Sequence, residues 1–234
     1  MSIMVETLIL VVGVTLLLWA IYPLIQKSSS LMEKFKPCRG DWWEAYLRGC
    51  ETWNGKPLPV EPINSYTNVA YLAAGWITFR LLDSPPSLVF ALAMAYLCIG
   101  SALYHGVKTI WAAALDHSGM YAVFSALAIY AMAPDHRLIL IPMIIGTLAA
   151  AYFLRYVFHG NVSVRMGLLL SLMLVGALLR GNSRLGLLSI GLFAGAMAVW
   201  QMDKKRILWK HWGHGIWHIF TAAAMAAMFL ALTP

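Results

Sequence analysis

Residues 87–106 read SLVFALAMAYLCIGSALYHG, a stretch of twenty residues that contains no Asp, Glu, Lys or Arg. A transmembrane α-helix needs about 20 consecutive, predominantly apolar residues to cross the hydrocarbon core of a bilayer. A turn-forming sequence, Asp83-Ser84-Pro85-Pro86, precedes the stretch, and Lys108 follows it. The stretch therefore predicts a membrane-spanning helix that carries His105 near its end.

The composition of the whole chain supports a membrane protein. Of the 234 residues, 61% are hydrophobic and 12% are charged, and the mean hydropathy is +0.71. A soluble domain averages about 25% charged and about 45–50% apolar residues, so this chain has too little polar surface to cover a globule in water. The net charge of +7 comes from Lys and Arg in short segments beside apolar blocks, which is typical of lipid contact and not of nucleic-acid binding.

Eight apolar stretches predict an all-α membrane protein, because helices satisfy their backbone hydrogen bonds internally in lipid. The domain prediction has three parts: an N-terminal transmembrane anchor at 1–26, a cytoplasmic or interfacial loop at 27–60, and a seven-helix core at 61–234. Aromatic residues in the loop suit a segment at the membrane interface, and a plain connecting loop fits equally well. The predicted spans are 3–25, 64–82, 87–106, 110–133, 138–158, 164–179, 185–202 and 212–232.

The distribution of positive charge predicts the orientation of these spans. With eight spans, thirteen of the 17 Lys and Arg residues fall on the side of the 27–60 loop, and four fall on the opposite side. Cytoplasmic loops carry the excess of Lys and Arg in membrane proteins. We therefore expect the loop in the cytoplasm and both termini outside.

Polar residues inside the spans are the candidate functional residues, because ionisable groups in a bilayer are costly and usually functional. Ser101 and His105 are four residues apart, as are His214 and His218, so each pair projects from one helix face. Asp116 lies early in the next span. The topology places the three histidines and Asp116 at one side of the membrane and at a similar depth, near the cytoplasmic face.

Three histidines at one level predict a zinc site. Three imidazole ligands leave a fourth position open for water, as in catalytic zinc sites, and zinc lowers the pKa of that water toward about 7 and polarises a carbonyl. Asp116 could move a proton from the water to a leaving amine, and Ser101 could donate a hydrogen bond to the oxyanion. The depth suggests an amide or ester of a lipid as the substrate.

The same residues resemble the pattern of a known family. Ser101-Ala-Leu-Tyr-His105, then Asp116 eleven residues later, then His214-Gly-Ile-Trp-His218 is similar to the alkaline ceramidase family. That family belongs to a membrane-hydrolase superfamily that includes adiponectin-receptor-like proteins. The resemblance covers roughly residues 48–234 as seven core helices, so the first span is an addition to it.

The resemblance implies a zinc-dependent hydrolase that cleaves the amide of ceramide or of a related N-acyl lipid. It implies His105, His214 and His218 as zinc ligands, with Asp116 and Ser101 as catalytic groups. The family also binds calcium in the loop before its core, which implies Glu51 and Glu61 as two calcium ligands. Arg48 and Trp53 stand where the family has an Asp and an Asn.

Other interpretations of the same residues stay open at this point. The three histidines could instead make three separate helix–helix hydrogen bonds. A receptor-like member of the superfamily would bind a lipid with little or no hydrolysis. A metal-ion transporter is a further alternative, although transporters place their sites near the midplane on broken helices.

Overall fold

The structure is a computed structural model, and it describes residues 2–27, 58–107, 110–132, 141, 143–145, 183–205, 207 and 212–233. Within these residues all regular structure is helical and no strand occurs, which confirms the predicted fold class in this respect. The predicted spans 138–158 and 164–179 lie almost wholly outside the described residues. A count of eight spans, with seven of them forming a core, therefore stays a prediction.

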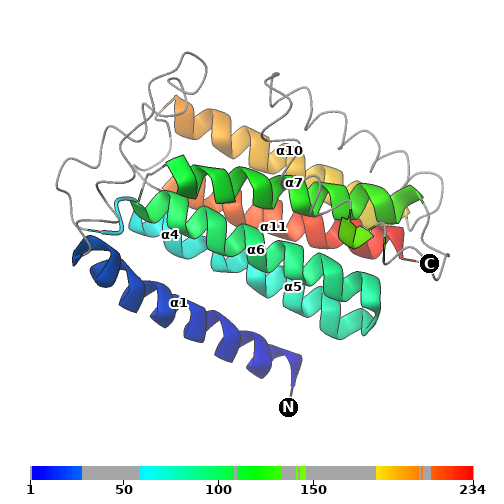
Figure 1. Cartoon of the computed structure of the whole chain (residues 1–234). Coiled ribbons are helices and arrows are strands. Elements are labelled where there is room, and N and C mark those ends of the chain that lie inside the picture. Colours follow the sequence, from blue (N-terminus) through cyan, green and yellow to red (C-terminus); the bar gives the residue numbers. More distant parts are fainter. Residues whose placement is uncertain are drawn as a thin grey trace.

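Figure 1 shows the helices running roughly along one common direction. Within the described part of the chain, four helices are long and apolar enough to cross a membrane, in the segments Ile3–Ile25, Pro85–Val107, Arg184–Asp203 and Trp212–Leu232. They are compatible with the predicted membrane protein. The helices are α1 (Ile3–Lys27), α4 (Pro62–Thr67), α5 (Val69–Leu82), α6 (Pro85–Val107), α7 (Ile110–Met132), α10 (Ser183–Lys204) and α11 (Trp212–Leu232).

The predicted span 64–82 contains two helices, α4 and α5, with a turn between them at Asn68. The Asn68 side chain donates Nδ2 to the carbonyl oxygen of Asn64 at 2.7 Å, and the Asn68 carbonyl accepts the backbone N–H of Tyr71 at 3.0 Å. Such side-chain bonds compete with the regular helical ladder. The predicted span is therefore helical but is divided at the single residue Asn68.

The predicted turn between the second and third spans is confirmed. Asp83 adopts the left-handed conformation, with φ 43° and ψ 47°, and its N–H donates to the carbonyl of Phe79. A residue in this conformation ends a helix, and Asp tolerates it better than most residues. Pro85 then begins α6, at the first helical position that suits proline.

Helices α6, α7 and α11 form the interior of the bundle. In the apolar spans of α6 and α11, 61% of the residues are buried, against 11% in α1 and 17% in the span of α10. Phe90 near the start of α6 stacks on Phe229 near the end of α11, with ring centroids 4.5 Å apart, so the two helices run antiparallel. The end of α6 and the start of α11 consequently lie at the same level.

Helix α7 packs closely on α6 through two glycines. A Cβ atom at Gly100 would lie 2.6 Å from the carbonyl carbon of Leu115, and one at Gly119 would lie 2.7 Å from the Cα of Leu97. These distances are shorter than a side chain allows, so the two backbones approach each other because both positions are glycine. Small residues permit this kind of close contact between membrane helices.

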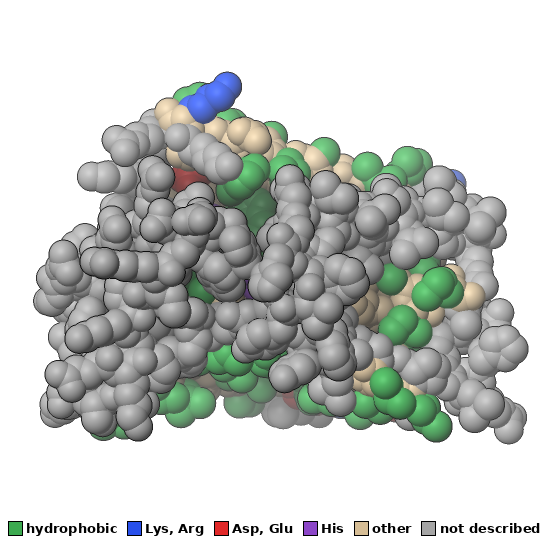
Figure 2. All heavy atoms as spheres, turned by 45° about the horizontal axis from the view of Figure 1, so that its top comes forward, with side chains coloured by type: hydrophobic (Ala, Val, Ile, Leu, Met, Phe, Trp, Pro, Cys, Tyr) green, Lys and Arg blue, Asp and Glu red, His purple; other side chains and the backbone are tan. Residues whose placement is uncertain are grey.

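Helix α1 lies at the edge of the bundle (Figure 1) and runs antiparallel to α4 and α5. Near its start, Glu6 pairs with Arg80 of α5 at 3.2 Å. Near its end, Tyr22 contacts Ser65 of α4. Much of the remaining helix is exposed and apolar, and the described side chains on the face shown in Figure 2 are likewise mostly hydrophobic. Such a surface suits contact with lipid.

Candidate metal centre

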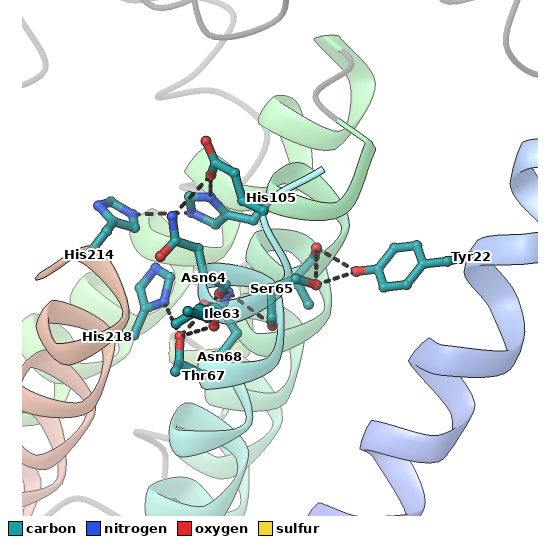
Figure 3. A network of polar contacts seen from close by, with 11 residues as sticks. Tyr22, Ile63, Asn64, Ser65, Thr67, Asn68, His105, His214 and His218 are labelled. Carbon is teal, nitrogen blue, oxygen red and sulfur yellow. Dashed lines mark hydrogen bonds and ion pairs between the residues drawn. The ribbon is translucent and has the colours of Figure 1, made fainter. Parts of the chain in front are cut away.

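Three histidines from two helices meet inside the bundle. His105 lies near the end of α6, and His214 and His218 lie one turn apart at the start of α11. One nitrogen atom from each ring lies within 4.8 Å of the other two, and the Nε2 atoms of His105 and His214 are 3.1 Å apart. Figure 3 shows the three rings gathered at one level. The structure thus brings together the three residues that the sequence predicts as metal ligands.

The histidine cluster is largely buried. His218 has no exposed surface and His105 exposes only 4% of its surface, whereas His214 is partly buried. A buried polar group destabilises the fold unless it has partners. For His105 and His218, the hydrogen-bond partner of the nitrogen that points away from the cluster indicates how the ring is oriented.

Glu61 orients His105. The Nδ1 atom of His105 lies 2.6 Å from Oε2 of Glu61, and an ionised carboxylate can only accept hydrogen bonds. Nδ1 therefore carries the hydrogen, and Nε2 presents its lone pair to the cluster. The backbone N–H of Glu61 also donates to the His105 carbonyl at 3.1 Å. Asn64 adds a bond from its Nδ2 to the same carboxylate oxygen at 3.1 Å.

Thr67 orients His218 in the same way. The Thr67 hydroxyl donates its single hydrogen to the carbonyl of Ile63 at 2.8 Å, so its oxygen accepts from Nδ1 of His218, which lies 3.0 Å away. His218 then also directs the lone pair of Nε2 away from Thr67. Gly215 allows this contact, because a Cβ atom there would lie 3.1 Å from the Thr67 methyl group.

A metal ion fits this set of donors. Lone pairs that converge from two neutral imidazoles repel each other unless a cation or a proton lies between them. Zinc–nitrogen bonds of about 2.0–2.1 Å separate two ligands of a tetrahedral site by roughly 3.3 Å, close to the 3.1 Å between His105 and His214. Metal-ligating histidines also usually donate their other N–H to a carboxylate or similar acceptor. The three histidines could therefore hold a metal ion.

The two predicted catalytic residues are both buried, and they lie on the adjacent helices α6 and α7. Ser101 is buried one turn before His105, and Asp116 is buried on α7. The close approach at Gly100 involves the backbone of Asp116 itself, since a Cβ atom at Gly100 would lie 2.9 Å from the Asp116 nitrogen.

Only one of the two predicted calcium ligands lies within the described residues. Glu51 lies outside the described residues. Glu61 is described, and one of its carboxylate oxygens contacts His105 and Asn64. Its side chain is about one third exposed, at 32%. The calcium site stays a prediction, and the described contacts connect Glu61 with the histidine cluster.

Sequence reasoning did not identify the partners of the histidines. Glu61, Asn64 and Thr67 follow one another at intervals of three residues, a spacing that places side chains along one face of a short helix. This face is the one that α4 turns toward the cluster (Figure 3). The three-residue spacing was thus the sequence feature that could have pointed to these partners of the histidines.

Comparison with known proteins gives no independent assignment of the site. The chain matches no protein-family model, no curated protein and no solved structure.

Proposed function

We propose that this chain is a zinc-dependent intramembrane hydrolase that cleaves the amide bond of ceramide or of a related N-acyl lipid. The observation that carries the proposal is the convergence of His105, His214 and His218 at one level of the bundle. Two of these rings have their Nδ1 atoms occupied by Glu61 and Thr67, so their Nε2 atoms serve as ligands. This donor set suits zinc.

The number of histidines supports hydrolysis over a purely structural metal site. Catalytic zinc sites have three protein ligands and one open position, whereas structural sites are closed by four. When bound, zinc would lower the pKa of a water molecule toward about 7 and polarise a carbonyl group. Among the described residues, the only cluster of three or more metal-binding side chains is this one.

The remaining roles fall to residues of α6 and α7. The Asp116 carboxylate accepts a proton from the attacking water and returns it to the nitrogen of the leaving amine, so that the C–N bond breaks to an acid and a neutral amine. The Ser101 hydroxyl donates a hydrogen bond to the carbonyl oxygen as negative charge develops on it. Both side chains are buried, which excludes bulk water and strengthens these interactions.

The location of the cluster supports a lipid substrate. His105 lies two residues before the end of α6, and His214 lies two residues after the start of α11, so the site is close to one end of two interior helices. The scissile amide of an N-acyl lipid lies just beneath the headgroup at a similar depth. Because most Lys and Arg residues fall on the side of the 27–60 loop, this end of the helices would face the cytoplasm and both termini would lie outside.

Both helices that carry the histidines are continuous through the site, whereas transporters bind ions at broken helices near the midplane. This continuity favours a hydrolase or a lipid receptor over a metal-ion transporter. The hydrolase and the lipid receptor differ in whether the bound lipid is hydrolysed.

The test compares the metal content and lipid turnover of the detergent-purified wild type with those of His214→Ala. We expect about one zinc per wild-type chain and release of fatty acid from an N-acyl lipid, and both should be lost in the variant. His136→Ala is the matched control, because the sequence places His136 in a polar turn beside Pro134. Bound zinc with lipid binding but no turnover would indicate the receptor-like function, and no zinc in the wild type would refute the metal site.

A further inference from the structure

Tyr22 of the N-terminal helix contacts both α4 and α6 close to the histidine cluster. Tyr22 of α1 exposes only 1% of its surface. Its hydroxyl donates to the carbonyl oxygen of Ala102 on α6 at 2.7 Å and lies 2.5 Å from the Ser65 hydroxyl on α4. With Tyr22 donating to Ala102, the single hydroxyl hydrogen of Ser65 goes either to the Tyr22 oxygen or to the same Ala102 carbonyl, 3.0 Å away. Three helices are thus joined at a single buried oxygen (Figure 3).

The ring of Tyr22 packs against the backbone of α6 at Gly106. A Cβ atom at this position would lie within 2.2–2.4 Å of the ring and its hydroxyl, so any other residue at 106 would expel Tyr22. Gly106 directly follows His105. The ring therefore packs on the stretch of α6 that carries the first histidine.

The contacts of Tyr22 lie about one turn from the Glu61–His105 contact, and they involve both segments that this contact joins. On α6, Ala102 comes three residues before His105. On α4, the backbone N–H of Ser65 donates to the Glu61 carbonyl at 2.8 Å, so Ser65 lies one turn after Glu61. Any shift of α4 relative to α6 that breaks the Tyr22 bonds would also move the Glu61 carboxylate relative to the His105 ring.

We propose that Tyr22 is a positioning residue of the metal centre, which holds α4 against α6 so that Glu61 fixes the orientation of His105. This inference rests on the proposed function, because it assumes that the histidines bind a metal. It assigns to α1 a part in the site beyond that of a membrane anchor. The scarcity of other buried contacts along α1 makes the hydroxyl a principal attachment of this helix.

The opposite end of α1 offers a matched control. The Glu6–Arg80 pair also attaches α1 to the bundle, but it lies near the end of α5, far along the helices from His105. Glu6→Gln would loosen α1 without touching the contacts at Ala102 and Ser65. An effect that comes only from loosening α1 would therefore appear in both variants.

The experiment measures zinc affinity by chelator competition, together with the visible absorption of bound Co²⁺, which reports ligand geometry. Tyr22→Phe keeps the ring against Gly106 and removes the hydroxyl. We expect about tenfold weaker zinc binding, at the lower end of the effects seen for outer partners of metal ligands, and an altered Co²⁺ spectrum. Glu6→Gln should leave both unchanged.

Ser65→Ala provides a second variant at the same junction in case Tyr22→Phe does not fold, and it should weaken zinc binding in the same direction. Wild-type affinity and spectrum in both variants would overturn the inference while leaving the zinc site intact. An equal loss in Glu6→Gln would also overturn it, because general loosening of α1 would then explain the effect. A wild type that binds no zinc or Co²⁺ would refute the proposed function and this inference together.

Discussion

The Nδ1 atom of His105 lies 2.6 Å from the Oε2 atom of Glu61, although 44 residues separate them in the sequence. This contact determines which nitrogen of His105 faces the other histidines. It also joins the segment before α4 to the end of α6, where the backbone N–H of Val60 bonds the carbonyl of Gly106 at 2.9 Å.

Glu61→Gln should weaken zinc binding by about tenfold or more, within the range found for hydrogen-bond partners of metal ligands. The amide oxygen of Gln can still accept the hydrogen of Nδ1, so the variant mainly removes the negative charge that makes His105 a better ligand. Chelator competition would measure the zinc affinity, and a calcium titration of the same variant would test the predicted calcium ligand. Lost calcium binding with unchanged zinc affinity would contradict this prediction and place Glu61 in a calcium site.

Thr67→Val should lower both the thermal stability and the zinc affinity. Valine keeps the shape that packs near Gly215, but it leaves the buried Nδ1–H of His218 without its acceptor, at a cost of about 1–3 kcal/mol. Thermal unfolding of the zinc-free and zinc-loaded protein in detergent would measure the effect. Thr67→Ser keeps the hydroxyl and should retain most of the affinity. Equal affinities in the Val and Ser variants would show that this hydrogen bond does not orient the ring.

Asp116→Asn should retain bound zinc and lose lipid turnover by about 100-fold or more, which is the usual contribution of a general acid–base group. The amide cannot accept and return the proton, but it fills the same volume in the buried site. Fatty-acid release at saturating lipid, measured beside the metal content, separates the two effects. Asp83→Asn is a suitable control, since Asp83 is exposed and left-handed, a conformation that Asn also adopts. Unchanged turnover in Asp116→Asn would remove this residue from catalysis.

Gly100→Ala should destabilise the protein by about 1–3 kcal/mol, the usual effect of overpacking. The added methyl group would lie 2.6 Å from the carbonyl carbon of Leu115, so α6 and α7 must separate. In Gly191→Ala on α10, the new methyl group meets no atom of another described element within 4 Å, and the better helix propensity of alanine should stabilise this variant by up to about 1 kcal/mol. Thermal unfolding of the two variants in detergent tests the difference. Equal stability would mean that α6 and α7 are not held in close contact at Gly100.

The sequence predicted the helices and the three histidines because both depend on local spacing. The predicted span 212–232 coincides with α11, and the span 87–106 lies within two residues of each end of α6. Four-residue spacing placed His214 and His218 on one face, and counting spans placed His105 at their level. The structure confirms that these three residues meet.

The contacts that support the histidines could not be derived in this way. Glu61 in a segment before a span has the sequence character of a solvated carboxylate, and Thr67 that of an ordinary helix residue. Their partners lie on other helices, and the register between helices depends on packing at positions such as Gly106 and Gly215. Asn68 interrupts its helix through a side-chain bond that the apolar pattern does not encode.

The distance in sequence between the two parts of the cluster has a consequence for biosynthesis. His105 and His214 are 109 positions apart, so at about 5–20 residues per second a ribosome needs roughly 5–20 s to produce the second after the first. During that interval α6 can occupy the bilayer with His105 held by Glu61 alone. An ion held by all three rings can therefore be bound only after α11 has been synthesised and has packed beside α6.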